Sequence, residues 1–167
     1  MAPTLGAIHR AGIPVMGHIG LTPQSASQLG GLKVQGRTAE AAGKLMDDAF
    51  ALQEAGAFAV IVECVPGEVS RLITERLRVP TISYGAGVHC DGQGMVSADM
   101  LGLFDRFMPK FAKRYVNLAP QILKVFENYR DEVVAGRFPA DEHTYSIDPK
   151  ELAALRGKAK RTRGKRR

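Results

Sequence analysis

The sequence predicts an α/β fold with a parallel sheet, on three observations. Short apolar runs rich in β-branched residues stand between glycines and prolines, as buried parallel strands do. Helical patterns of apolar residues separate these runs. The 167 residues are 45% hydrophobic and include 18 Gly and 9 Pro, a composition typical of a globular α/β domain. Strands that alternate with helices imply parallel crossovers, in either a doubly wound sheet or a barrel.

Continuous apolar runs predict four strands in this sheet. They are Ile13–Gly17, Phe58–Cys64, Thr81–Tyr84 and Met95–Ser97. The clearest helix is Ala39–Ala55, because Ala42, Leu45, Ala49 and Leu52 recur at steps of three and four residues. Thr38 is expected to cap its start and Gly56 its end. Two further helices are predicted, over Glu68–Leu77 and Pro120–Ala135.

The formal charge of +6 is concentrated at the C-terminus. Residues 156–167 hold 8 of the 23 Lys and Arg and no acidic residue, which leaves a net charge of −2 on residues 1–155. We expect residues 148–167 to form a basic, disordered tail. The tail is either a solvated extension without a dedicated role or a weak contact for nucleic acid, and base-stacking aromatic residues are absent from it.

The cysteine content and the hydropathy indicate a cytoplasmic protein. Cys64 and Cys90 follow no metal-ligand spacing, so both are expected to be free thiols in a reducing compartment. The longest apolar run, Ala57–Val62, is too short to cross a bilayer, and no membrane contact is expected.

Polar residues at the ends of predicted strands are the candidates for chemistry, because strand ends converge on one crevice in parallel α/β folds. Glu63 ends the most hydrophobic strand, where its carboxylate is a general base or only a helix cap or ion-pair partner. His18 occupies the matching position after Pro14–Gly17 and is expected to line the pocket wall rather than bind metal. Asp91 lies in a glycine-rich segment, and Gly85–Gly87 is either a phosphate cradle or a tight turn.

Taken in order, these segments resemble the ketopantoate hydroxymethyltransferase family. The resemblance covers residues 5–147, and its motifs match the family's fifth to eighth strands and the loops that follow. The matching segments are Gly12–Ser25, Gly30–Arg37, Glu63–Pro66, Gly85–Gly87, Asp91–Gln93, Asp99–Gly102, Pro109–Tyr115 and Gly136–Pro139. The resemblance implies the C-terminal half, strands five to eight, of a TIM-type (β/α)8 barrel, with residues 1–147 as a partial barrel domain.

The resemblance also implies a reaction. The family transfers a hydroxymethyl group from methylenetetrahydrofolate to α-ketoisovalerate and gives ketopantoate for pantothenate biosynthesis. Mg²⁺ holds the keto acid while a glutamate removes the proton beside the carbonyl, and on the matching motif that glutamate is Glu63. His18 matches a histidine of the substrate pocket. No residue of this chain is assigned as a metal ligand.

The resemblance leaves out the family's first four strands, which carry the residues for metal and keto acid. The chain starts within what resembles the fourth helix, Thr4–Ala11, and Ser83 and Tyr84 stand where the family has smaller or aliphatic residues. We therefore expect the isolated chain to be inactive and to need an N-terminal half-barrel or self-association. The alternatives are a truncated, non-catalytic relic and a small α/β domain that binds a phosphorylated ligand and carries a nucleic-acid-binding tail.

Overall fold

The computed structural model describes the backbone of residues 1–164 and the side chains of residues 1–156. Contacts between Cα atoms divide the chain into two units, Met1–Leu118 and a second that begins at Ala119. The first unit carries the sheet, and the second is helical.

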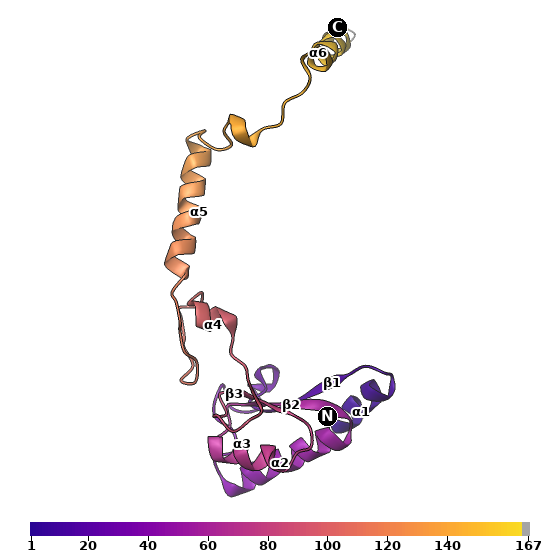
Figure 1. Cartoon of the computed structure of the whole chain (residues 1–167), viewed down its shortest axis with the longest axis vertical. Coiled ribbons are helices and arrows are strands. Elements are labelled where there is room, and N and C mark those ends of the chain that lie inside the picture. The colour runs from indigo at the N-terminus through magenta and orange to yellow at the C-terminus, as the bar shows by residue number, and fades with distance from the viewer. Residues whose placement is uncertain (165–167) are drawn as a thin grey trace. The chain divides into compact units, whose positions relative to one another are not determined.

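The first unit is built on four parallel strands in the order β1-β2-β3-β4, as Figure 1 allows the reader to follow for the first three. The strands are β1 (Val15–Gly20), β2 (Ala57–Glu63), β3 (Thr81–Tyr84) and β4 (Gly92–Gln93). The parallel α/β class predicted from the sequence is therefore confirmed. With this order, β1 and β4 are the two edge strands of the sheet.

Helices connect the first three strands. α2 (Ala39–Glu54) joins β1 to β2, and α3 (Gly67–Thr74) joins β2 to β3; both lie along one side of the sheet in Figure 1. The other helical elements of this unit are α1 (Ala2–Arg10), the 3₁₀ turn η1 (Pro23–Ser25) and α4 (Ser97–Leu101). The predicted cap of α2 is confirmed, because the Ala41 N–H donates to Thr38 Oγ1 at 3.1 Å.

The strand register separates the two faces of the sheet. Paired residues of parallel strands point to the same side, so Ile19 lies beside Val62 on one face and His18 beside Ile61 on the other. The first face packs into the core with Leu52 of α2 and Ile73 of α3. The second face carries half-buried or exposed side chains, namely Met16, His18, Ile61, Glu63, Ile82 and Tyr84.

Two strand predictions need correction. The first strand spans Val15–Gly20 rather than Ile13–Gly17, so His18 lies within it and not after it. Ile13 stays outside because it precedes Pro14, which has no N–H for the ladder. The predicted strand Met95–Ser97 is wrong, since Gly92 and Gln93 form β4 instead. Directly after β4, the Gly94 N–H donates to the Ser83 carbonyl at 2.8 Å. Helix α4 then begins at Ser97, three residues later.

Helix α3 is shorter than predicted, and its ends follow from hydrogen bonding. It begins at Gly67 and ends at Thr74, where the sequence predicts Glu68–Leu77. The Leu77 N–H still donates to the Ile73 carbonyl at 3.1 Å, so one further turn follows the helix before Pro80 leads into β3.

The second unit comprises α5 (Ala119–Val134), the 3₁₀ turn η2 (Asp141–His143) and α6 (Pro149–Gly164). The rings of Tyr129 and Phe138 meet edge to face with centroids 5.5 Å apart. The sequence led us to expect disorder over residues 148–167, whereas Pro149–Gly164 is helical. Asp148 begins this helix by accepting the Lys150 N–H at 2.8 Å, and proline is well suited to its first position.

Within the described residues, no helix has both the length and the apolar character that crossing a membrane requires. The predicted nucleic-acid contact of the tail depends on side chains of residues 157–167, which lie outside the described residues.

Candidate functional site

His18 and Glu63 meet at the carboxyl ends of two adjacent strands. In the register, Gly20 pairs with Glu63 and His18 pairs with Ile61, which places both side chains on the same face of the sheet. His18 Nε2 lies 3.1 Å from Glu63 Oε2. The side chains keep 28% and 18% of their exposure, so a ligand can reach the pair although most of its surface is removed from water. The structure thus brings together the two candidate residues that the sequence places 45 positions apart.

The backbone at Glu63 is held from both sides. Its carbonyl accepts the Leu21 N–H at 2.8 Å, and the Cys64 N–H donates to the Tyr84 carbonyl at 2.9 Å. The Cys64 carbonyl in turn accepts the Gln35 N–H at 2.8 Å. Cys64 adopts a φ of +50°, which is uncommon for a residue with a side chain and costs about 1 kcal/mol or more. These hydrogen bonds fix the turn that follows Glu63.

Gly20 ends β1 against this turn and needs to be glycine. Its φ is +87°, and a Cβ there would overlap the Glu63 carbonyl oxygen and lie 2.7 Å from Val65 Cγ2. A side chain at Gly20 would therefore displace the peptide that carries the candidate base. Gly20 is a positioning residue, recognisable in the sequence only as part of the loop after His18.

The Cys64 thiol next to Glu63 is not an activated nucleophile. Burial raises the pKa of the Cys64 thiol, and the negative charge of Glu63 raises it further. A thiol with a raised pKa holds less thiolate at any given pH. The predicted free thiols are confirmed for both Cys64 and Cys90.

Asp91 has a structural role, away from Glu63. Its Oδ2 accepts the Thr81 N–H at 2.8 Å and the Thr81 hydroxyl at 3.1 Å. Thr81 begins β3, so these bonds lie at the amino edge of the sheet, whereas Glu63 lies at the carboxyl edge. The structure therefore does not bring Asp91 to the strand-end site.

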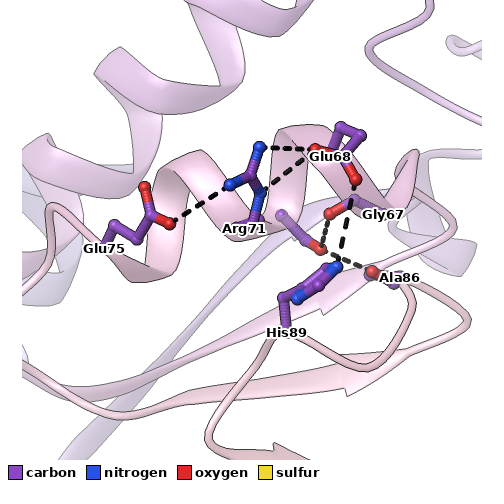
Figure 2. A network of polar contacts seen from close by, with 7 residues as sticks. Gly67, Glu68, Arg71, Glu75, Ala86 and His89 are labelled. Carbon is purple, nitrogen blue, oxygen red and sulfur yellow. Dashed lines mark hydrogen bonds and ion pairs between the residues drawn. The ribbon is translucent and has the colours of Figure 1, made fainter.

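The Gly85–Gly87 loop is a packed turn. The Ala86 N–H donates to Ser83 Oγ at 3.0 Å, and the fully buried Ser70 hydroxyl contacts the carbonyl oxygens of Ala86 and Gly67. Figure 2 shows Gly67 beside Ala86 at the start of α3. The Ala86 amide, which a phosphate cradle would need, is already used within the protein.

Ion pairs run along α3 from its first turn to its C-cap. Figure 2 shows Arg71 between Glu68 and Glu75, while Glu68 also reaches His89. Arg71 lies 2.7 Å from Glu68 Oε2 and 3.7 Å from Glu75 Oε1, and His89 Nε2 is 4.0 Å from Glu68 Oε1. All four side chains are more than a third exposed, so these pairs add little stability.

The described residues do not bring together a set of three side-chain metal ligands. Mg²⁺ needs several oxygen ligands in octahedral geometry, of which proteins commonly supply one or two carboxylates. Glu63 is paired with His18, and no group of three His, Cys, Asp or Glu side chains able to hold a metal occurs in the described part of the chain.

Fold and site together define an α/β protein with an imidazole–carboxylate pair at the carboxyl edge of a parallel sheet. The model of the family described as ketopantoate hydroxymethyltransferase matches residues 1–141, and the chain belongs to this family.

Relatives named 3-methyl-2-oxobutanoate hydroxymethyltransferase match most of the chain. The relative from Heliobacterium modesticaldum is 54% identical over 148 residues, which are 89% of this chain and 54% of that protein. The relative from Moorella thermoacetica is 58% identical over 145 residues, 87% of this chain and 54% of that protein. The chain thus spans about half the length of the curated relatives it matches.

Proposed function

We propose that this chain is the C-terminal half of a (β/α)8 barrel that converts α-ketoisovalerate to ketopantoate, with Glu63 as the general base. Methylenetetrahydrofolate supplies the one-carbon unit. The observation that carries the proposal is the contact between His18 Nε2 and Glu63 Oε2, at 3.1 Å on adjacent strand ends. The family membership and the names of the relatives support the reaction class.

In this proposal, Glu63 accepts the proton from the carbon beside the keto group of α-ketoisovalerate. The resulting enolate carbon forms a bond with the methylene carbon of the folate, and both bonds from that carbon to folate nitrogens break. Water supplies the hydroxyl group, and the two nitrogens take up one proton from water and the proton that Glu63 removed. The products are ketopantoate and tetrahydrofolate. A general base placed in this way contributes a rate factor of roughly 10² to 10⁴.

His18 is proposed as the pocket residue that orients Glu63. An N–H at His18 Nε2 donates to Glu63 Oε2, which leaves Glu63 Oε1 for the substrate proton. The hydrogen bonds of the turn at Cys64 fix the backbone of Glu63, from which the same carboxylate extends. The substrate therefore meets a base whose position is set before binding.

The rest of the barrel is proposed to complete the site. β1 and β4 are edge strands with free ladder positions, and the face that carries Glu63 also exposes Met16 at 38%. A complementary half-barrel, or a second copy of the chain, would cover this face and pair with these edges. We place the magnesium ligands in that complementary part.

Supplying the missing part tests the function. The segment of the Moorella relative that precedes its matched region is to be co-expressed with this chain, and ketopantoate formation measured with and without methylenetetrahydrofolate. We expect turnover by the pair and none by the chain alone. Turnover that survives Glu63→Gln without loss would contradict the role of Glu63 as the general base. Turnover by the chain alone would contradict the proposal that the chain is half of a barrel.

A further inference from the structure

A segment of high positive charge, residues 156–167, takes no part in the chemistry proposed for Glu63. It holds 8 of the 23 Lys and Arg and no Asp or Glu. Residues 1–155 carry the other 15 basic residues and all 17 acidic ones, a net charge of −2. The net charge of +6 on the whole chain therefore comes from residues 156–167, the basic segment.

Much of the basic segment has a helical backbone, since residues 156–164 belong to α6 (Figure 1). Positions three, four or seven apart share a face of an α-helix. Two groups of cationic positions have this spacing, namely Arg156, Lys160 and Arg163, and Lys158 and Arg161. The helical backbone therefore carries cationic positions along two of its faces, over about 10 Å of its axis.

The helix dipole accounts for only part of this charge. Cations stabilise the last turn of a helix, as carboxylates stabilise its start, and the effect falls off within that turn. Asp148 and Glu151 at the start of α6 fit this pattern, but Arg156 and Lys158 lie well before the last turn. Like charges three or four positions apart also repel each other and weaken a helix, so this spacing favours a partner that neutralises them.

Arg156 is the cation of the basic segment whose side chain the structure describes. It is exposed, and within residues 1–156 no carboxylate forms an ion pair with it. The basic segment itself contains no Asp or Glu. The guanidinium group of Arg156 is therefore available to an external anion.

The composition of the basic segment favours one class of polyanion. A helix that lies on a membrane needs an apolar face opposite its cations. Apart from glycine, Ala159 is the only apolar residue of the segment, so the sequence does not supply this face. Aromatic residues, on which unpaired bases stack, are absent from it as well. The remaining feature is charge, which suits the phosphates of a duplex, spaced at about 1.7 Å along its axis.

We propose that the basic segment binds the phosphate backbone of double-stranded nucleic acid, without preference for base sequence. Each phosphate contact contributes about −0.9 to the slope of log affinity against log salt concentration. The five cationic positions within α6 give a slope of about −4.5, and all 8 cations of the segment would give about −7. With five contacts, affinity falls roughly 500-fold between about 50 and 200 mM salt. This binding needs neither Glu63 nor the reaction proposed for it.

Binding of labelled duplexes by the whole chain tests the proposal. Fluorescence anisotropy is to be measured at several salt concentrations, with DNA and RNA duplexes of about 20 base pairs, each in two unrelated sequences. We expect slopes between about −4.5 and −7, and affinities for the two sequences that agree within about threefold. DNA and RNA duplexes are both expected to bind, because they share the phosphate backbone.

Charge variants supply a matched control. The tail variant combines Lys160→Gln, Arg161→Gln and Arg163→Gln, and glutamine preserves helix propensity. It is expected to make the slope shallower by about 2.7 and to weaken binding at least about tenfold at about 50 mM salt. The control variant replaces three exposed cations by glutamine, namely Lys124, Arg130 and Arg137. It lowers the net charge equally and is expected to keep the slope and affinity of the parent chain, and circular dichroism establishes that both variants fold like the parent.

Four results would overturn the proposal: no binding of either duplex at about 50 mM salt, an unchanged slope in the tail variant, equal losses in the two variants, or vesicles of phosphatidylcholine and phosphatidylserine binding as tightly as the duplexes. A single strand of DNA that binds more tightly than the duplex would also contradict it, because base stacking would then contribute. Glu63→Gln separates this inference from the proposed function, since duplex binding is expected to survive in this variant while ketopantoate formation is lost.

Discussion

Replacing Gly20 by alanine tests how closely the end of β1 is fitted to the candidate base. At a φ of +87°, any residue with a Cβ is strained by about 1 kcal/mol. The new Cβ would also push away the Glu63 carbonyl, which accepts the Leu21 N–H at 2.8 Å. Leu21 is only 4% exposed, so an unpaired N–H there costs about 1–3 kcal/mol. We expect a total loss of about 3 kcal/mol in the free energy of unfolding.

Gly12 provides the matched control for this substitution. It has a nearly equal φ of +83°, and a Cβ there would meet nothing within 4 Å. Gly12→Ala is therefore expected to cost only the strain, about 1 kcal/mol. Urea unfolding followed by circular dichroism, at one fixed protein concentration, measures both variants. Equal losses for Gly20→Ala and Gly12→Ala would refute the close fit between Gly20 and Glu63.

Three further substitutions test helix α2, the Asp91–Thr81 contact and the Cys64 thiol. Gly43 lies within α2, and a Cβ there would meet nothing within 4 Å. Gly43→Ala is therefore expected to raise the free energy of unfolding by about 0.5–1 kcal/mol. A lower free energy of unfolding in urea would contradict the free space at Gly43. Asp91→Ala leaves the N–H of the fully buried Thr81 unpaired, and it is expected to lower the free energy of unfolding by about 2 kcal/mol, with a smaller loss for Asp91→Asn. An unchanged midpoint of urea unfolding for Asp91→Ala would contradict the structural role of Asp91. Removing the charge of Glu63 lowers the pKa of the Cys64 thiol. In a Cys90→Ser background, Glu63→Gln is therefore expected to speed the alkylation of Cys64 by iodoacetamide at mildly alkaline pH. An equal or slower rate of alkylation would contradict the effect of the Glu63 charge.

The order of the elements could be predicted because local patterns determine it. The strand at Thr81–Tyr84 was predicted with its observed bounds, and the predicted start of the helix at Ala39, with its Thr38 cap, is also confirmed. In both cases the deciding signals, an apolar run after Pro80 and a capping hydroxyl, lie within a few residues of the element.

The wrong fourth strand and the misplaced Asp91 arose where distant contacts decide the structure. β4 consists of Gly92 and Gln93, which have poor strand propensity and owe their place to pairing with Ile82 and Ser83. The sequence likewise could not reveal that Asp91 reaches Thr81 at the opposite edge from Glu63.

The site was partly predictable, because local patterns identify the two strands that carry it. His18 lies two residues before the end of β1 and Glu63 ends β2, and parallel pairing of those strands places them together. A cavity beside Tyr84 was not predicted, because its wall combines β3 with Phe111 and Tyr115, which have no periodic relation to the strand.

Proton exchange at α-ketoisovalerate tests the role of Glu63 most directly. The complemented enzyme is to be placed in deuterated buffer without folate, and loss of the proton beside the keto group followed by NMR. We expect exchange with the parent chain and a decrease of roughly 10²-fold or more with Glu63→Gln. Exchange at the parent rate in Glu63→Gln would show that another group is the base.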